Sequence, residues 1–336
     1  MTLTELQREL LPLVESGMKA FLDTQDFGSS TELKEMLTYH MGWQDGSRGK
    51  RIRPLLTLMC VGALGGNPEN AFPAAISIEF LHNFTLIHDD IQDQSPLRHG
   101  RSTLWQKWGI PQAINAGDAL FSIAQLAMLE LDAVHNRDIA IRAAILLNQT
   151  CLHLTRGQYH DMAFERADSI SIETYREMIE GKTAALVAFC AAVSGIITNQ
   201  SDTTIELLAD FGKSLGMAFQ IKDDILGIWG NPDATGKSVA SDLISKKKTL
   251  PILYGLEHSS AFQQLWSVQD QPIENIETMV YILNDCGAQN FAASQAETYT
   301  ARALKNLRTL SKIPESKPYF SDPLMELCES LLARNI

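Results

Sequence analysis

The sequence lacks paired cysteines, an excess of positive charge and long uncharged apolar runs. Its 336 residues include five scattered cysteines, so neither a disulfide framework nor a paired-cysteine metal site is expected. The net charge of −12 disfavours nucleic acid and anionic membranes as partners. Charges run throughout the N-terminal segment, and no window resembles a signal peptide or a membrane span. We therefore expect a cytoplasmic protein without an integral membrane segment.

Strand signals are also missing, because alternating apolar runs and Asn-Gly hairpin turns do not occur. Apolar residues instead recur at helical spacing in segment after segment. The clearest of these segments are residues 4–22, 72–90, 116–134, 139–159 and 172–197. No linker rich in glycine, serine or proline divides the chain. The pattern predicts an all-α helical bundle that forms a single domain over residues 1–336.

An acidic cluster ends one of the apolar helices. In the segment LIHDDIQD, Asp89 and Asp93 lie four residues apart and therefore share one face of a helix. A solvated helix end would explain a lone acidic cluster, but the preceding residues are apolar enough to be buried. Carboxylates at the mouth of a buried region suit magnesium, which completes its shell with water and phosphate oxygens.

A second apolar helix ends in a similar way. Gln220 and Asp223 lie one turn apart, and Asp224 follows. Both acidic helix ends are trailed by loops that carry lysine or arginine. Acid and base can be adjacent if a metal-bound diphosphate lies between them, so the two ends together predict a diphosphate site.

Other basic residues fit the same interpretation. The segment GSRGKRIRP presents Lys50, Arg51 and Arg53 after glycines, although a basic helix start is often only solvated surface. Lys182 interrupts an apolar run, where an unpaired lysine is costly to bury unless it extends to the surface. Lys237 and Lys247 belong to the loop after Asp224, which is either a lid or a solvated charge run.

These residues resemble the trans-prenyltransferase, or polyprenyl diphosphate synthase, family. The resemblance runs through the chain in order, in GKRIRP, LHNFTLIHDDIQD, LRHGRST, AGDAL, GQYHD, GKTAAL, FQIKDDILG and TGKSVASDLISKKKTLP. It implies an isoprenoid synthase fold, a single large helical bundle around a central cavity. It also implies a homodimer that joins isopentenyl diphosphate to an allylic diphosphate, with three magnesium ions per active site.

The resemblance also implies roles for individual residues. It places Asp89, Asp90 and Asp93 in the first aspartate motif and Asp223 and Asp224 in the second, with Asp89, Asp93 and Asp223 as metal ligands. Arg98, Lys182, Lys237 and Lys247 match positions that bind the allylic diphosphate. Lys50, Arg53 and His82 match the isopentenyl diphosphate site, while Thr183 and Gln220 match polar residues at the reacting centre.

Three positions depart from the family pattern. His99 stands where a second arginine usually binds isopentenyl diphosphate, and a histidine cannot make an arginine-type bidentate contact. We hypothesise that Arg101 compensates. Gly227 replaces the last aspartate of the second motif and Asn231 replaces a nearby aspartate, so metal binding there depends more on Asp223.

Product length in the family depends on the residues just before the first motif. Here these are the bulky Phe84 and the small Thr85, with no insertion between Asp90 and Asp93. The pattern resembles geranylgeranyl diphosphate synthases with an aromatic floor, and farnesyl diphosphate is the second expectation. Phe84 could equally be an ordinary core residue.

Two other functions remain open from the sequence. A class I terpene cyclase shares the fold and the first aspartate motif, and His99 favours it. The region of Asp223 lacks the usual cyclase spacing, however, and Lys50, Arg53 and His82 would have no purpose there. A non-catalytic subunit of a heteromeric synthase is the other alternative, although such subunits typically lose the aspartates that this chain retains.

Overall fold

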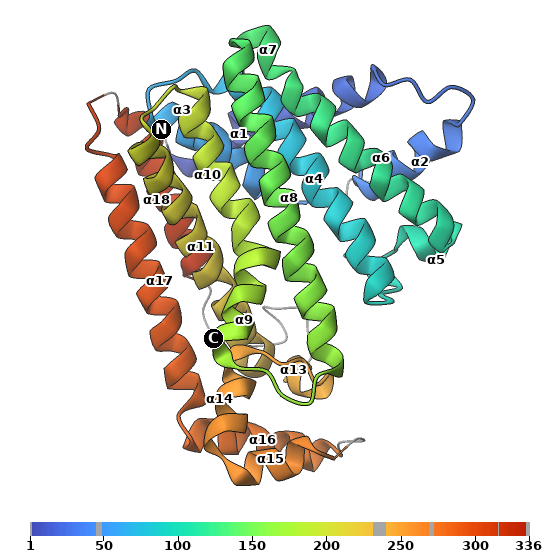
Figure 1. The fold of residues 1–336 in the computed structure, drawn as a ribbon, viewed down its shortest axis with the longest axis vertical. Coiled ribbons are helices and arrows are strands. Elements are labelled where there is room, and N and C mark those ends of the chain that lie inside the picture. Colours follow the sequence, from blue (N-terminus) through green and yellow to red (C-terminus); the bar gives the residue numbers. More distant parts are fainter. Residues whose placement is uncertain (1, 45–48, 231–239, 269–271, 315, 334–336) are drawn as a thin grey trace. The chain divides into compact units, whose positions relative to one another are not determined.

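The computed structural model describes residues 2–44, 49–230, 240–268, 272–314 and 316–333. Its described residues are predominantly helical (Figure 1). The chain divides into two compact units. Unit 1 comprises residues 1–148, 190–205 and 311–324, and unit 2 comprises residues 149–189, 206–310 and 325–336. That the chain forms one domain over residues 1–336 therefore stays a prediction.

The first elements along the chain belong to unit 1. They are α1 (Leu3–Asp23), α2 (Thr31–His40), α3 (Ile52–Ala63), the 3₁₀ turn η1 (Pro68–Ala71), α4 (Phe72–Gln92), β1 (Leu97–Arg98), β2 (Arg101–Ser102), α5 (Leu104–Trp108), α6 (Ile110–Leu129) and α7 (Leu131–Val134). Four further helices contribute residues to both units: α8 (Arg137–Arg166), α10 (Ala185–Ile197), α11 (Asp202–Trp229) and α18 (Pro318–Leu332).

The remaining elements belong to unit 2. They are α9 (Ile172–Ile179), the π-helical turn η2 (Glu180–Ala184), α13 (Ser241–Ile244), α14 (Leu250–His258), α15 (Ser260–Trp266), α16 (Ile273–Asp285) and α17 (Ala288–Leu310). The all-α prediction is confirmed. Helices cover the predicted segments, although segment 116–134 is divided at Glu130 and segment 172–197 is interrupted by η2. The short antiparallel hairpin of β1 and β2 was not predicted, because two residues per strand are too few to show an alternating pattern.

Helix α4 is the central element of unit 1. It is apolar around most of its circumference, as a helix surrounded by others must be. The buried hydroxyl of Ser77 donates a hydrogen bond to the Ala124 carbonyl of α6 at 2.7 Å, which joins the two helices. Gly117 on α6 lies against the ring of His88, where any larger residue would clash with that ring. The close packing of α4 and α6 fixes the last turn of α4, where the first aspartate motif lies.

Unit 2 has a core of its own. Tyr175, Met178 and Ile179 of α9 pack with Ile221 and Ile225 of α11. One helical stretch among the described residues, Ile172–Ile197, is long and apolar enough to cross a membrane by length and composition. Most of its apolar window is buried within the protein, so the stretch is equally typical of a core helix.

Candidate active site

The first aspartate motif occupies the end of α4. Asp89 lies in the last turn and Asp93 is the C-cap residue, whose backbone amide donates to the Asp89 carbonyl at 2.8 Å. Asp89 is half-buried and Asp93 is exposed, whereas Asp90 is buried. The three carboxylates therefore differ in access to a ligand, and Asp90 faces the protein interior.

Asp90 pairs with the arginine of the hairpin. The Nε atom of Arg98 donates to both Asp90 oxygens, at 2.9 and 3.1 Å, and its Nη2 lies 2.8 Å from Oδ1. Burial raises the pKa of Asp90, and the Arg98 guanidinium only partly opposes that rise. The predicted diphosphate-binding arginine is thus held by Asp90, the only aspartate of the first motif that was not predicted to bind metal.

The hairpin turn explains the histidine at position 99. His99 and Gly100 have φ values of 52° and 77°, and hairpin turns of this kind require positive φ at both central residues. Histidine is enriched in this conformation relative to most residues. His99 is exposed at the tip, and the neighbouring Arg101 stacks on the Tyr39 ring, 4.1 Å from its centroid, while its Nη2 donates to the Tyr39 carbonyl at 2.8 Å. Arg101 is therefore close to His99 in the sequence, but its guanidinium is held by the ring and the carbonyl of Tyr39.

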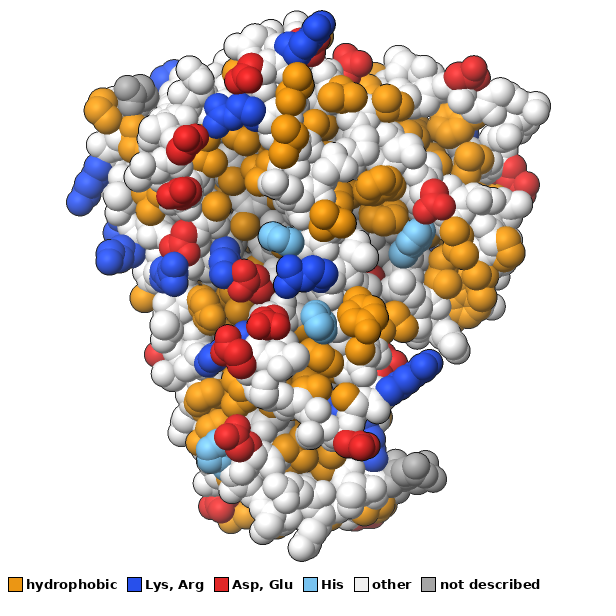
Figure 2. Space-filling view, in the orientation of Figure 1, with side chains coloured by type: hydrophobic (Ala, Val, Ile, Leu, Met, Phe, Trp, Pro, Cys, Tyr) orange, Lys and Arg blue, Asp and Glu red, His pale blue; other side chains and the backbone are white. Residues whose placement is uncertain are grey.

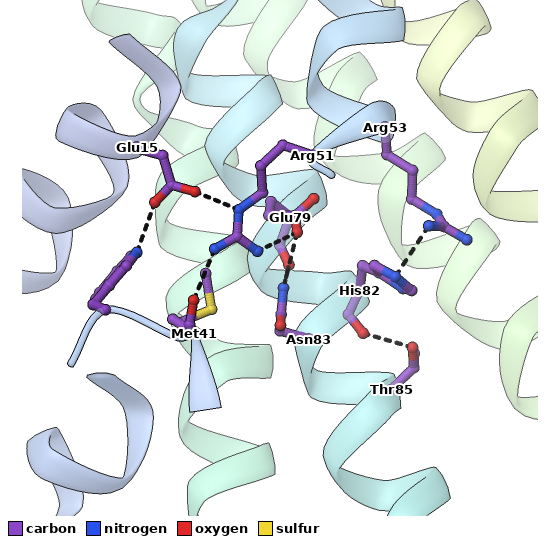
Figure 3. Close-up of polar contacts among 9 residues, drawn as sticks. Glu15, Met41, Arg51, Arg53, Glu79, His82, Asn83 and Thr85 are labelled. Carbon is purple, nitrogen blue, oxygen red and sulfur yellow. Dashed lines mark hydrogen bonds and ion pairs between the residues drawn. The ribbon is translucent and has the colours of Figure 1, made fainter. Parts of the chain in front are cut away.

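The residues matched to isopentenyl diphosphate lie on α3, on the loop before it, and on α4 (Figure 3). Nη1 of Arg53 lies 3.0 Å from Nε2 of His82. Burial, reinforced by the charge of Arg53, lowers the pKa of His82 well below its usual value. The imidazole is therefore neutral and accepts the hydrogen bond at Nε2. Lys50, on the loop before α3, is exposed.

Arg51, which the sequence grouped with these cations, has a different environment. It is only 5% exposed and points into the core. Its guanidinium lies between Glu15 of α1 and Glu79 of α4, 2.7 Å from each carboxylate (Figure 3). The charge pattern of the sequence alone could not separate it from Lys50 and Arg53.

In unit 2, the π-helical turn η2 presents two of the predicted residues. Lys182 forms an ion pair with Asp161 of α8, and the Thr183 hydroxyl donates to Oε1 of Gln220 at 2.8 Å. Gly157 of α8 packs against the backbone of Gly181 and Lys182 so closely that no side chain fits. A π-turn adds a residue to the helix and is frequent at functional sites. The added residue accounts for the position of Lys182 away from the apolar face of this helical stretch.

The second aspartate motif lies near the end of α11. Gln220 donates from Nε2 to Oδ1 of Asp224 at 3.0 Å, and the buried Tyr175 hydroxyl also donates to Asp224. Burial raises the pKa of Asp224 to about 6, against the opposing charge of Lys247. Partial desolvation of Lys247 is outweighed by Asp224 and nearby aspartates, so its pKa is raised. Asp223 is half-buried.

A carboxylate that the sequence analysis did not single out lies beside Gly227. The carboxylate of Asp242, a buried residue of α13, lies against Gly227 where a side chain would otherwise be. A carboxylate is therefore present beside this position although the motif itself lacks one. Lys237 and Asn231 lie outside the described residues.

Phe84 and Thr85 lie on α4, about one turn before the first motif. The Phe84 ring packs against His88 at 4.8 Å and against Phe121 of α6 at 5.1 Å between centroids. The Thr85 hydroxyl donates to the His82 carbonyl at 2.8 Å. Phe121 is an aromatic neighbour that the sequence did not single out, because its pairing depends on how α4 and α6 pack.

The donor set fits magnesium. Within the described part of the chain, no three acidic, histidine or cysteine side chains converge as a complete metal site. Asp89 and Asp93 offer hard oxygen donors in unit 1, and Asp223 offers another in unit 2. Magnesium usually takes few protein carboxylates and retains water and phosphate oxygens, so incomplete sets of this kind suit it.

Comparison with known proteins gives consistent matches. Residues 30–286 match the family model described as polyprenyl synthetase. The chain is 36% identical over 287 residues to (2E,6E)-farnesyl diphosphate synthase of Mycobacterium tuberculosis, covering 81% of this chain and 79% of that protein. It is also 36% identical over 287 residues to geranylgeranyl pyrophosphate synthase of Geoglobus acetivorans, covering 85% and 87%. The crystal structure of a polyprenyl synthetase from Streptomyces coelicolor A3(2) matches with a TM-score of 0.88 and 31% identity, covering 98% and 100%.

Proposed function

The chain belongs to the polyprenyl synthetase family, and we propose that it is a short-chain trans-prenyl diphosphate synthase that condenses isopentenyl diphosphate with an allylic diphosphate. The observation that carries the proposal is the arrangement on α4. Asp89 and Asp93 end the helix, and His82, paired with Arg53, lies two turns earlier. One helix thus carries carboxylates for a metal-bound diphosphate and a neutral imidazole joined to a cation.

The first step of the reaction is ionisation of the allylic carbon–oxygen bond. Asp89, Asp93 and Asp223 would hold magnesium, which when bound neutralises charge on the departing diphosphate. By the family resemblance, Arg98, Lys182, Lys237 and Lys247 would add positive charge around the same group. Asp90 and Asp161 hold two of these cations in position. Three ions per site is the number that the family resemblance implies.

The second step is attack of the isopentenyl double bond on the allylic cation. Lys50, Arg53, His82 and His99 bind the second diphosphate, and the hydrogen bond between Thr183 and Gln220 orients polar groups near the reacting carbons. Apolar helices exclude water that would otherwise quench the cation. Loss of a proton to the released diphosphate then restores an alkene.

The proposed product is geranylgeranyl diphosphate, with farnesyl diphosphate as the second possibility. The half-buried Phe84 ring and its contact with Phe121 support a floor that limits the length of the growing chain. Relatives whose names carry each of these products are about equally similar to this chain. The product must therefore be determined directly.

We further propose that the enzyme is a cytoplasmic homodimer. In unit 1, side chains that are apolar yet exposed recur on α6 and α8, and Figure 2 displays hydrophobic side chains over these helices. They include Leu126, Leu129, Ile141 and Ile145. Asn148 of α8 donates to Gln125 of α6 at 3.0 Å, so the two helices lie side by side. Exposed apolar side chains on neighbouring helices favour association with a second copy. Sedimentation of the purified protein as a monomer would contradict the dimer.

One assay tests the reaction. Purified protein is incubated with magnesium, isopentenyl diphosphate and the five-, ten- or fifteen-carbon allylic diphosphate, and the products are identified by mass spectrometry. Elongated linear diphosphates are expected. Cyclic hydrocarbons would indicate a terpene cyclase instead, and inactivity with every primer would indicate a non-catalytic subunit.

A further inference from the structure

A buried ionic cluster lies beside Arg53 and His82, two of the residues proposed to bind isopentenyl diphosphate (Figure 3). Arg51 donates from Nε to Glu15 and from Nη1 to Glu79, each at 2.7 Å, and from Nη2 to the Met41 carbonyl at 2.9 Å. The side chain of Arg51 is 4% exposed, and those of Glu15 and Glu79 are 10% and 5% exposed. One side chain thus joins the loop before α3 to the end of α2, to α1 and to α4.

Each carboxylate has a further donor. Nε1 of Trp43 donates to Glu15 at 2.7 Å, and Nδ2 of Asn83 donates to Glu79 at 3.1 Å. The Trp43 bond satisfies the second oxygen of Glu15, whereas Asn83 and Arg51 share Oε1 of Glu79. Both carboxylates therefore accept from two donors, and the geometry of the cluster is fixed from several elements at once.

The cluster contains two carboxylates and one guanidinium, so it carries surplus negative charge. Burial would lower the pKa of Arg51, but Glu79 and Glu15 outweigh it and the pKa is raised. Burial lowers the pKa of Arg53, and the neighbouring Cys190 and Glu79 act against that decrease. Arg53 itself lies within hydrogen-bond distance of the neutral imidazole of His82.

The cluster also determines where the neighbouring cations lie. Arg51 is the N-cap residue of α3 and adopts a left-handed conformation, with φ 48° and ψ 38°. A non-glycine residue holds this conformation at a cost, so other contacts must fix it. This turn leaves Lys50 exposed and sets Arg53 on the first turn of α3. Glu79 and His82 lie three residues apart on α4, so Arg51 and Arg53 contact successive turns of that helix.

We propose that Arg51, held by Glu15 and Glu79, is a positioning residue that aligns Lys50, Arg53 and His82 for isopentenyl diphosphate without touching it. This inference rests on the proposed function, because it assigns Lys50, Arg53 and His82 to that substrate. Stability alone does not explain the cluster, because buried ionic triads can often be replaced by apolar residues at no cost. The cluster is therefore better understood as a device for orientation.

The test compares Michaelis constants for the two substrates. Arg51→Lys retains the charge, but a single ammonium cannot reproduce the three directed contacts of the guanidinium. We expect the KM for isopentenyl diphosphate to rise about tenfold, the loss of roughly one charge-assisted contact, while the KM for the allylic diphosphate stays within about twofold. Glu15→Gln removes one negative charge and leaves a single acceptor oxygen for Trp43 or Arg51, while the contacts of Arg51 with Glu79 and Met41 remain, so a smaller selective rise of about threefold is expected.

Ser77→Ala is the matched control. It removes a buried hydrogen bond of α4, two residues before Glu79, and that bond is directed toward α6. Its melting temperature should fall while the ratio of the two KM values stays unchanged. A selective rise in the isopentenyl KM of this control would overturn the inference, since any disturbance of α4 would then have the same effect.

The remaining outcomes separate the two proposals. Calorimetric titration of isopentenyl diphosphate into the wild-type protein accompanies the kinetics. If the wild type neither binds this substrate nor elongates a primer, the proposed function fails. If the wild type does both and Arg51→Lys changes both KM values equally, or neither, only the role of Arg51 is overturned. Should Arg51→Lys fail to fold, the same criterion applied to Glu15→Gln decides.

Discussion

The guanidinium of Arg98 is bound to both carboxylate oxygens of Asp90, with the closest contact at 2.8 Å. This pair divides the first aspartate motif into two functions. Asp90 is buried and holds an arginine, whereas Asp89 and Asp93 lie at the accessible end of α4. Three aspartates that look alike in the sequence are therefore expected to behave differently when they are replaced.

Replacing Asp89 by Asn should affect metal binding, and replacing Asp90 by Asn should affect the allylic substrate. We expect Asp89→Asn to lower kcat by about 100-fold or more, the usual loss when a group that stabilises transition-state charge is removed, and to raise the magnesium concentration for half-maximal activity. Asp90→Asn releases Arg98 and should raise the KM for the allylic diphosphate about tenfold, the loss of roughly one charge-assisted contact. Magnesium titrations of both variants check the difference. Equal magnesium dependence in the two variants would contradict the division.

Restoring an aspartate at position 227 should destabilise the protein. The Asp242 carboxylate already occupies the space beside Gly227, so Gly227→Asp brings a steric clash and a second buried negative charge. Overpacking alone costs about 1–3 kcal/mol, and the like charge adds to it. Thermal unfolding measures the effect.

The control for this experiment is the double variant Gly227→Asp with Asp242→Gly, which exchanges the two residues. It should recover much of the lost stability, because the clash and the repulsion are both removed. Additive losses in the double variant would show that the contact between the two positions is not the cause.

The helical fold could be predicted because apolar spacing is a local property. Helix α4 was expected over residues 72–90 and spans Phe72–Gln92. The stretch 172–197 was expected as one helix, but the π-turn Glu180–Ala184 interrupts it where Gly157 of α8 meets Gly181. That contact joins residues distant in the chain, so helical periodicity within one segment could not reveal it.

The site was predictable only where residue type implies chemistry. Asp89, Asp93 and Asp223 could be selected because carboxylates at the ends of apolar helices indicate a hard metal ion. The burial of Arg51 could not be predicted, because it depends on Glu15 and Glu79, which are 36 and 28 residues away. Nothing in a run of basic residues shows which member points into the core.

Acid should destabilise the protein partly through His40. Burial, together with the charges of Arg98, Arg51 and Arg101, lowers the pKa of His40 to about 3. The unfolded chain binds a proton at this residue below pH about 6.5, and the folded protein does not, so stability falls as the pH decreases from about 6.5 toward 3. His82, whose pKa is also lowered, acts in the same direction.

His40→Gln should therefore reduce the loss of stability between pH 7 and pH 5. Protonation of His40 in the unfolded chain lowers the free energy of unfolding by about 1.4 kcal/mol per pH unit below pH 6.5, or roughly 2 kcal/mol at pH 5. Melting temperatures of the wild type and the variant at the two pH values check this. The exposed His153 gives the matched substitution, and an effect of His153→Gln as large as that of His40→Gln would contradict the assignment.

Product length should respond to Phe84 and, more weakly, to Phe121. The two rings pack together at 5.1 Å between α4 and α6, so removing the Phe84 ring opens space one turn before the aspartate motif. We expect Phe84→Ala to add at least one five-carbon unit to the main product, and Phe121→Ala to broaden the product distribution. Phe80→Leu is the control, because Phe80 lies one turn earlier on α4, is fully buried and packs against Phe21 of α1. Chromatography of the dephosphorylated products decides, and an unchanged product from Phe84→Ala would mean that this ring packs the core without limiting chain growth.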